Sequence, residues 1–404
     1  MVVVSVAAEE PTVVGDTAAP WQDIIPGLPD DVSLRCLARI SHGFHGVLQT
    51  VCKRWREVFR SEEFGAFQSS MGWSGDWIFV LTESPSNSTH PPNWIGYDPA
   101  NDSWHPLPPA PTPPQFFHLH HRGFSSVSVS SRLLVIGGAY SPPSPPPASP
   151  HVTTDLVFQF DPCRNSWTRL ASMLSPRSHF ACAVLDGKVF VAGGRNSLSP
   201  WGISSAEVYD PLTDRWEELP VMRDPQSDCV GLSFNGKFCV LSDQVGLSEM
   251  NVSQVFDPSD RTWCIQEQAW PFSRAMQFGI QVMPDERVYA IADWGSSVIK
   301  TRLHDDEQWL SVGVVPPVVI PGHRRPLEAF SYGFTALRGK LYVLGGKVLR
   351  WQEAGTGWFD IVKLNCVRVC DPDVKPLQWK ARRPMCCDVG GCIIGCTSLE
   401  EGRT

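Results

Sequence analysis

The stretch Tyr97-Asp98-Pro99-Ala100-Asn101-Asp102-Ser103-Trp104 decides the fold, because its pattern returns along the chain. An aromatic residue precedes Asp-Pro, and a tryptophan follows the aspartate at a fixed offset. Three further copies keep this offset: Phe160 to Trp167, Tyr209 to Trp216 and Phe256 to Trp263. A degenerate copy ends at Trp309 and a stretched copy runs from Cys370 to Trp379, so the sequence contains six repeated units.

A second phrase lies upstream of the first in each unit: a turn, a short apolar run and then a glycine pair. The clear pairs are Gly137-Gly138, Gly193-Gly194 and Gly345-Gly346, and the same register holds Leu81-Thr82, Ser242-Asp243 and Ala292-Asp293 in the other units. Short β-branched and aromatic runs separated by Gly, Asn and Asp-Pro are typical of strands joined by turns. We therefore expect each unit to be a small sheet of four strands.

These units resemble kelch repeats, whose pattern places a glycine pair after the second strand and a spaced Tyr and Trp further on. The resemblance covers residues 73–399 and implies a mainly β fold, a six-bladed kelch β-propeller, whose closed ring leaves only short strand edges. The first unit begins at its second strand, Trp77 to Leu81, and a spare strand-like run follows the last unit at residues 387–398. We expect this C-terminal run to close blade 1 as its innermost strand.

A small all-α segment precedes the repeats. Leu28-Pro29-Asp30-Asp31 predicts a helix start, because proline needs no donor at a first helical position and carboxylates favour the positive helix end. Apolar residues then keep helical spacing as far as Val58. The segment resembles an F-box, whose pattern is Leu-Pro, an apolar-Leu pair and a Val-Cys-x-x-Trp helix. We predict an F-box over residues 21–68 and a disordered tail over residues 1–20.

The F-box resemblance implies partners. In that family the module docks on a Skp-type adaptor, which bridges to a cullin. Carried over by position, the adaptor-binding residues would be Leu28, Pro29, Leu37, Leu48, Val51 and Trp55. A segment of this length buries little surface alone, so an adaptor would complete its core. The alternative is that these residues only cap and fill a helical bundle packed on the propeller.

The propeller topology predicts where a protein substrate binds. In a four-stranded meander, the connections after strands two and four emerge on one face, and those after strands one and three emerge on the other. Blade 1 starts with strand two, so we expect the F-box on the latter face and a free face opposite it. Blades 2 and 6 carry long loops there, including a polyproline-like run at residues 141–150. Exposed aromatic and arginine side chains favour recognition, and the candidates are Tyr140, Arg177, Arg195, Trp201, Arg350, Trp351 and Trp358.

Composition restricts the partners further. A formal charge of −8 and a pI near 5.8 argue against nucleic acid or an anionic membrane recognised by bulk electrostatics. A basic cluster, Lys53, Arg54, Arg56 and Arg60, could bind nucleic acid, yet its spacing fits a solvated helix face. No apolar stretch approaches the roughly 18 residues of a membrane span. Thirteen scattered cysteines predict reduced thiols and a cytoplasmic or nuclear protein.

No catalytic motif is apparent, so we expect no catalytic residues, no metal and no cofactor. The histidines 118, 120 and 121 could bind metal, but no Cys or acidic partner lies at ligand spacing, so a loop role is favoured. The cysteines between 366 and 396 could also bind metal, but their apolar neighbours favour packing. The whole chain is similar to plant F-box/kelch-repeat proteins. That resemblance implies a non-catalytic substrate receptor of an SCF ubiquitin ligase, which contributes proximity. The alternative is a propeller enzyme or cytoskeletal scaffold with a structural helical segment.

Overall fold

The computed structural model describes residues 23–72, 75–83, 93–116, 119–142, 152–242, 252–267, 279–283, 285–292, 297–302, 309–321, 325–351, 359–386 and 391–400. The predicted disordered tail over residues 1–20 lies outside these ranges. So do His118, Trp358 and most of the proline-rich run.

The N-terminal segment forms a bundle of short helices. These are α1 (Asp30–Ala38), the 3-10 helix η1 (His42–Phe44), α2 (His45–Leu48), α3 (Lys53–Arg60) and α4 (Glu62–Ser70). Pro29 occupies the cap of α1, one residue earlier than predicted, and two aspartates form the first turn. Ser61 caps α4, where its hydroxyl oxygen accepts a hydrogen bond from the Phe64 N–H at 3.1 Å.

In the described residues after the helices, six four-stranded antiparallel sheets form the blades of a propeller. From the innermost strand outward, blade 1 contains β30 (Ile393–Leu399), β1 (Trp77–Thr82), β2 (Ile95–Asp98) and β3 (Ser103–Pro106). Blade 2 contains β5 (Ser125–Val129), β6 (Arg132–Ile136), β9 (Val157–Asp161) and β10 (Ser166–Arg169). Blade 3 contains β11 (Ala181–Leu185), β12 (Lys188–Ala192), β13 (Ala206–Asp210) and β14 (Arg215–Leu219).

The other three blades repeat this order. Blade 4 contains β15 (Cys229–Phe234), β16 (Lys237–Ser242), β17 (Val252–Asp257) and β18 (Thr262–Glu267). Blade 5 contains β19 (Ile280–Val282), β20 (Val288–Ala292), β21 (Val298–Arg302) and β22 (Leu310–Val314). Blade 6 contains β24 (Gly333–Leu337), β25 (Lys340–Leu344), β28 (Val367–Cys370) and β29 (Lys380–Arg382). The predicted fold class, a six-bladed kelch propeller with a small helical domain, is confirmed.

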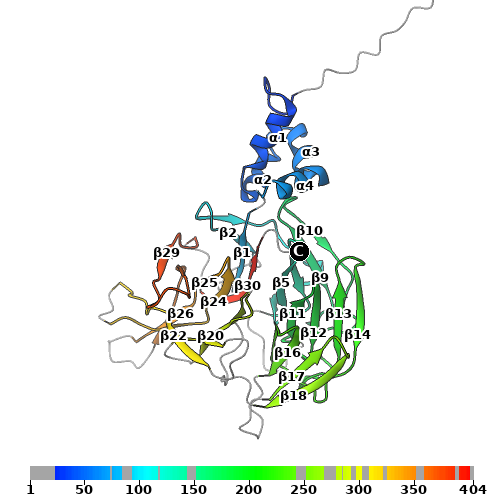
Figure 1. The fold of residues 1–404 in the computed structure, drawn as a ribbon, viewed down its shortest axis with the longest axis vertical. Coiled ribbons are helices and arrows are strands. Elements are labelled where there is room, and N and C mark those ends of the chain that lie inside the picture. The colour runs from blue at the N-terminus through cyan, green and yellow to red at the C-terminus, as the bar shows by residue number, and fades with distance from the viewer. Residues whose placement is uncertain are drawn as a thin grey trace, which may run out of the picture.

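The ring closes through the C-terminal strand. β30 pairs antiparallel with β1 from Trp77 opposite Leu399 to Thr82 opposite Ile393. It also lies between the innermost strands of blades 2 and 6, so each blade has a neighbour on both sides. Figure 1 shows β30 beside β1 at the centre of the molecule, below the helices.

The repeated phrase explains how the blades are joined. Its aspartate caps the turn between strands three and four, as where Asp210 Oδ1 accepts a hydrogen bond from the Leu212 N–H at 2.9 Å. Its tryptophan reaches back to the preceding blade: the indole of Trp216 donates to the Ala171 carbonyl at 2.9 Å. Trp104, Trp167, Trp263 and Trp379 make the same kind of bond. The bond from Trp104 in blade 1 to Arg383 after blade 6 spans the closure.

The glycine pairs are required by backbone geometry. Gly194 has a φ of +88°, and a Cβ there would lie 2.7 Å from the Ser178 carbonyl oxygen. The other complete pairs also have positive φ. The pair therefore ends strand two without a side chain, so that a neighbouring connection can pass closely.

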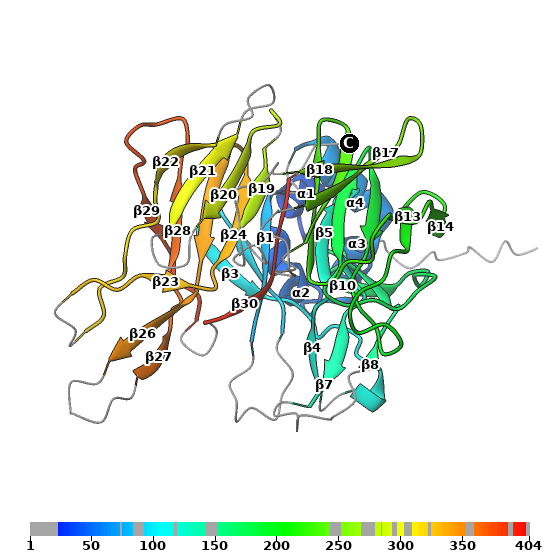
Figure 2. The same cartoon turned by 90° about the horizontal axis from the view of Figure 1, so that it is seen from below.

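Two small sheets extend the face opposite the helices. One contains β4 (His120–Arg122), β7 (Ala139–Ser141) and β8 (Val152–Thr153) in blade 2, preceded by η2 (Pro114–Phe116). The other contains β23 (Ala329–Phe330), β26 (Lys347–Trp351) and β27 (Phe359–Lys363) in blade 6. Figure 2 shows both projecting on the same side of the molecule. The prediction of long free-face loops in blades 2 and 6 is thereby confirmed.

Candidate interaction surfaces

The helical bundle has its own core. Leu37, Phe59 and Phe64 are buried in it together with Ile24, Ala38 and Val58. The prediction that Leu37 contacts an adaptor is wrong, because the same helical spacing that placed it on α1 turns it fully into this core. Leu48 and Trp55 are half-buried against the core, and the Trp55 indole donates a hydrogen bond to the Ile24 carbonyl at 2.6 Å.

Other apolar side chains of the bundle are left in solvent. Leu28 is 37% exposed, Val51 is 59% exposed and Val47 is 66% exposed. Pro29 is exposed as well, and so is Val32 one turn along α1 from Leu28. A bundle this small does not need to expose so many large apolar groups for its own folding, so this surface is a candidate docking site.

The bundle rests on blades 1 and 2 through η1, α2 and α4. His45 Nδ1 lies 3.0 Å from the Cys163 carbonyl oxygen, and Glu62 pairs with Arg164 at 2.7 Å. Both partners belong to the β9–β10 turn, which follows the third strand of blade 2. This is the face on which the sequence places the F-box, and the prediction is confirmed. Figure 1 shows α2 and α4 next to the propeller, and α1 and α3 farther away.

Two buried histidines, His42 and His45, lie at this junction. Gln68 donates its amide N–H to the Ala38 carbonyl at 2.7 Å, so its oxygen faces His42 Nε2 at 2.7 Å and that nitrogen carries the proton. Burial lowers the pKa of His42 to about 3 and also lowers the pKa of His45, although the carbonyl oxygens of Cys163 and Ile40 beside its two ring nitrogens act to raise it; a neutral ring donates to only one of them. Both rings are therefore neutral at physiological pH.

Most of the basic side chains of α3 make hydrogen bonds or ion pairs within the protein. Arg56 and Arg60 donate to the backbone and side-chain oxygens of Gln49, each at 3.1 Å. Arg54 lies 3.9 Å from Asp30. These contacts brace the helix against the preceding loop, which fits the interpretation of a solvated structural face.

On the free face, Glu83 joins the two extensions. It follows β1 and pairs with Arg122 of β4 at 2.5 Å and with Lys347 of β26 at 3.2 Å. Arg350, one of the predicted substrate residues, is partly exposed and pairs with Asp360 across β26 and β27 at 2.6 Å. The side chain of Trp351, like Trp358, lies outside the described structure.

Two predicted substrate residues are wrong as exposed contacts. Tyr140 is buried, because its ring stacks between Phe116 and His121 with centroids 4.4 Å from each. Arg177 is fully buried in an ion pair with Glu207. Two others remain available: Trp201 is exposed, and Arg195 is partly exposed beside Asp228.

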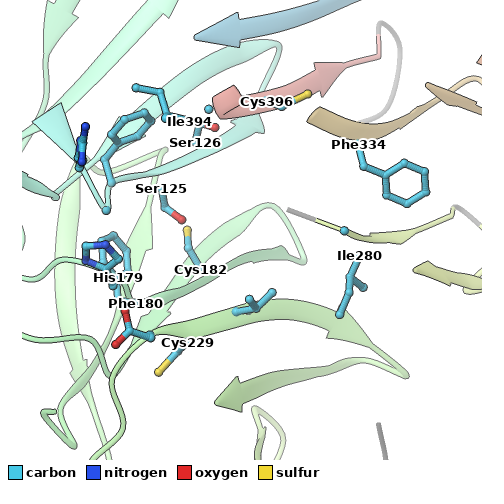
Figure 3. Close-up of a pocket in the computed structure, with 18 of the residues that line it drawn as sticks. Ser125, Ser126, His179, Phe180, Cys182, Cys229, Ile280, Phe334, Ile394 and Cys396 are labelled. Atoms are coloured by element: carbon cyan, nitrogen blue, oxygen red, sulfur yellow. The ribbon is translucent and has the colours of Figure 1, made fainter. Parts of the chain in front are cut away.

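A central cavity of 410 Å³ opens where the innermost strands begin, on the free face. Figure 3 shows Ser125, Cys182, Cys229 and Cys396 contributed to it from different strands. Burial raises the pKa of these three thiols to about 12, so they are not thiolates at neutral pH and are poor nucleophiles and metal ligands. The cavity is large enough to accept a protruding side chain or short loop.

Within the described ranges, no group of three or more His, Cys, Asp or Glu side chains has the arrangement to hold a metal ion. No helix among the residues that the structure describes is long and apolar enough to cross a membrane.

Comparisons with known proteins match both parts of the chain. The F-box domain model matches residues 25–67, and the kelch motif model matches residues 120–174 and 176–223. The F-box/kelch-repeat protein At1g16250 of Arabidopsis thaliana is 56% identical over 382 residues, which cover 94% of this chain and 98% of that protein. The F-box/kelch-repeat protein SKIP30 of the same plant is 31% identical over 383 residues, covering 93% and 97%. The solved structure of YjhT is 14% identical with a TM-score of 0.47, over 69% of this chain and 86% of that one.

Proposed function

Because the chain belongs to the family of F-box/kelch-repeat proteins, we propose that it is the substrate-recognition subunit of an SCF-type ubiquitin ligase. An F-box joined to kelch repeats is the domain combination of SCF substrate adaptors, and an F-box implies a Skp-family adaptor and, through it, a cullin. In the proposal, the propeller binds a target protein on its free face while the helices hold the adaptor.

One observation carries the proposal. Leu28, Pro29 and Val51 stay exposed although the bundle has already formed a core and a junction with the propeller. The junction uses η1, α2 and α4, so it leaves the start of α1 uncovered. Apolar groups in this position are stabilised when a second subunit removes them from water, by about 25 cal/mol for each Å² buried.

The proposed role is non-catalytic. The chain would raise the effective concentration of a target beside a ubiquitin-charged enzyme. Burial keeps the cavity cysteines protonated, which favours packing over chemistry at the propeller centre. Free thiols throughout the described residues also favour a reducing compartment, so we place the protein in the cytoplasm or nucleus.

Co-expression with a Skp-family adaptor tests the proposal. We expect the full chain to co-purify with the adaptor at equal stoichiometry. The double variant Leu28→Ala and Pro29→Ala should lose the adaptor while its propeller keeps the melting temperature of the wild type. Leu212→Ala is a matched control, because Leu212 is 94% exposed on a propeller turn. Retention of the adaptor by the double variant would refute the proposed docking surface.

A further inference from the structure

Three connections on the free face lie side by side around blade 3. They are residues 170–180 before β11, residues 193–205 between β12 and β13, and residues 220–228 after β14. Backbone hydrogen bonds join the first to the second, from the Arg195 N–H to the Ser178 carbonyl at 2.9 Å. Others join the second to the third, from the Met222 N–H to the Ser204 carbonyl at 2.8 Å. We call these three connections the blade 3 rim.

A buried ion pair between Arg177 and Glu207 stabilises the backbone of the blade 3 rim. Arg177 lies 2.5 Å from Glu207, and neither side chain is accessible to solvent beyond 2%. Arg177 also donates to the carbonyls of Gly193 and Ser205 at 3.0 Å each. Glu207 accepts hydrogen bonds from the backbone N–H of Leu174 at 2.7 Å. A charge pair so fully removed from water persists only where its geometry is closely satisfied, so it fixes the connections that surround it.

The blade 3 rim holds large apolar side chains in solvent on this rigid backbone. Leu198 is 91% exposed, Trp201 is 87%, Val221 is 66% and Leu174 is 53%. The turn that carries Leu198 is fixed by Asn196, whose Oδ1 accepts hydrogen bonds from the N–H groups of Leu198 and Ser199 at 3.0 and 2.8 Å. An exposed tryptophan is a typical binding anchor, and exposed aliphatic side chains add apolar area that a partner can bury.

The charges around these side chains neutralise one another. Arg195 pairs with Asp228 at 3.4 Å, and the exposed Arg223 and Asp224 are adjacent and opposite in sign. The rim therefore presents no net field that would attract a strongly acidic or basic segment. A partner that is complementary to the blade 3 rim is therefore an apolar segment of low net charge.

Leu174, Leu198, Trp201 and Val221 form the apolar patch of the blade 3 rim. Its area favours one kind of binding partner. Four such side chains offer on the order of 400 Å² of exposed apolar area, whereas stable protein–protein interfaces bury about 800 Å² of polar and apolar surface together on each partner. A second copy of this chain would need polar contacts beyond these side chains, whereas a short segment can bind to them alone.

We propose that the blade 3 rim binds a short, apolar, weakly charged segment of the target protein, with Trp201 and Leu198 as the anchors. This inference rests on the proposed function, since it names the class of target segment that the substrate receptor would select. Arg177 and Glu207 act as positioning residues beneath the patch.

A displayed library of random 12-residue peptides, screened against the full chain co-purified with its adaptor, tests the inference. We expect the enriched peptides to contain large apolar residues and a net charge near zero. In fluorescence anisotropy, Trp201→Ala and Leu198→Ser should each raise the Kd of an enriched peptide at least tenfold. Leu212→Ser, on the F-box face, is the control for an exposed leucine and should change the Kd less than twofold.

Each other outcome overturns the inference. It falls if no peptide is enriched, if enriched peptides are strongly charged, or if Trp201→Ala leaves their Kd unchanged. It also falls if light scattering shows a dimer that Trp201→Ala dissolves, because the patch would then bind a second copy. Adaptor co-purification in the same samples reports separately on the proposed function, so the two failures are distinguishable.

Discussion

His45 Nδ1 of α2 lies 3.0 Å from the carbonyl oxygen of Cys163 in the β9–β10 turn, and this contact joins the F-box to blade 2. The neighbouring Arg164 pairs with Glu62 of α4, and its carbonyl accepts a hydrogen bond from Gln49 at 3.4 Å. Three residues of the helical bundle thus reach one turn of the propeller. We expect the F-box and the propeller to behave as one unit, with the adaptor surface at one end and the free face at the other.

Replacing His45 by alanine should loosen this junction. The change leaves a partly buried carbonyl without its partner and opens space in the bundle, at a cost of about 1–3 kcal/mol. Amide hydrogen exchange should accelerate in α2 and α4, while adaptor co-purification persists because Leu28 and Val51 are untouched. Arg164→Ala is the comparison, since it keeps the backbone carbonyls of the turn and removes only the partly exposed pairs with Glu62 and with Asp161 at 3.4 Å, each worth less than about 1 kcal/mol. Unchanged exchange in the His45 variant would contradict the joined-unit interpretation.

The same junction predicts a pH dependence of stability. Because the pKa values of His42 and His45 are lowered by folding, the unfolded chain binds protons first as the pH falls. The slope from the two histidines is small at about pH 7.5 and grows as the pH falls through the unfolded pKa of 6.5. Below it the free energy of unfolding should decrease, by up to about 1.4 kcal/mol for each pH unit from His42 alone. Asp98, Arg132 and Asp161 also act on these rings.

Urea unfolding between pH 7.5 and 5.5 measures this slope. Most carboxyl groups stay ionised in that window, so the histidines dominate the change. His42→Gln removes the group with the lowest pKa and should reduce the slope, although it lowers stability at pH 7.5; the remaining slope comes from His45 and from His105, His120 and His121, whose pKa values burial also lowers. An equal slope in the variant and the wild type would rule out His42 as the source.

Loss of the inter-blade indole bonds should weaken the ring. Trp104→Phe removes the donor to the Arg383 carbonyl at the closure and keeps most of the packing, so we expect a loss of about 1 kcal/mol in the free energy of unfolding. Trp201→Phe makes the same chemical change at an exposed site and should stay within about 0.5 kcal/mol. Equal effects at both positions would show that Trp104 contributes packing alone.

Removal of the C-terminal strand should prevent folding. A chain that ends before Gly391 lacks β30, which leaves Ile78 and Phe79 of β1 without their inner neighbour and opens the ring. We expect it to aggregate or to lose its cooperative melting transition. A chain that ends at Glu400 keeps β30 and should melt as the full chain does. A soluble, cooperatively melting chain without β30 would show that the other blades suffice.

Much of this architecture could be predicted because its signals are local. The glycine pair and the Asp-Pro turn each require a particular backbone conformation within a few residues. The repetition of these phrases in six units predicts the fold class. Closure by β30 could be inferred because a strand was missing at one end and spare at the other. The face occupied by the F-box followed from the same count of strands.

The burial of single side chains could not be predicted in the same way. Arg177 lies in a connection and looks like an exposed contact, but its partner Glu207 is 30 residues away on β13. Tyr140 is covered by Phe116 and His121, which reach it from separate segments. For Leu37 the F-box pattern implied contact with an adaptor, but its side chain packs in the core of the helical bundle with Phe59 and Phe64. Burial set by distant partners is not visible in a local pattern.

The ion pair beneath the blade 3 rim gives the last prediction. Glu207→Gln leaves the Arg177 guanidinium buried without its counter-charge, so we expect a loss of about 3–5 kcal/mol in the free energy of unfolding. The double variant Arg177→Met with Glu207→Leu removes both charges and should recover much of this loss, because the desolvation penalty disappears with the pair. It also removes the hydrogen bonds that hold the backbone of Leu174 and Gly193. Amide exchange should therefore stay faster across residues 193–205 in the double variant than in the wild type, even at similar stability. Wild-type exchange rates there would show that the pair does not position the rim.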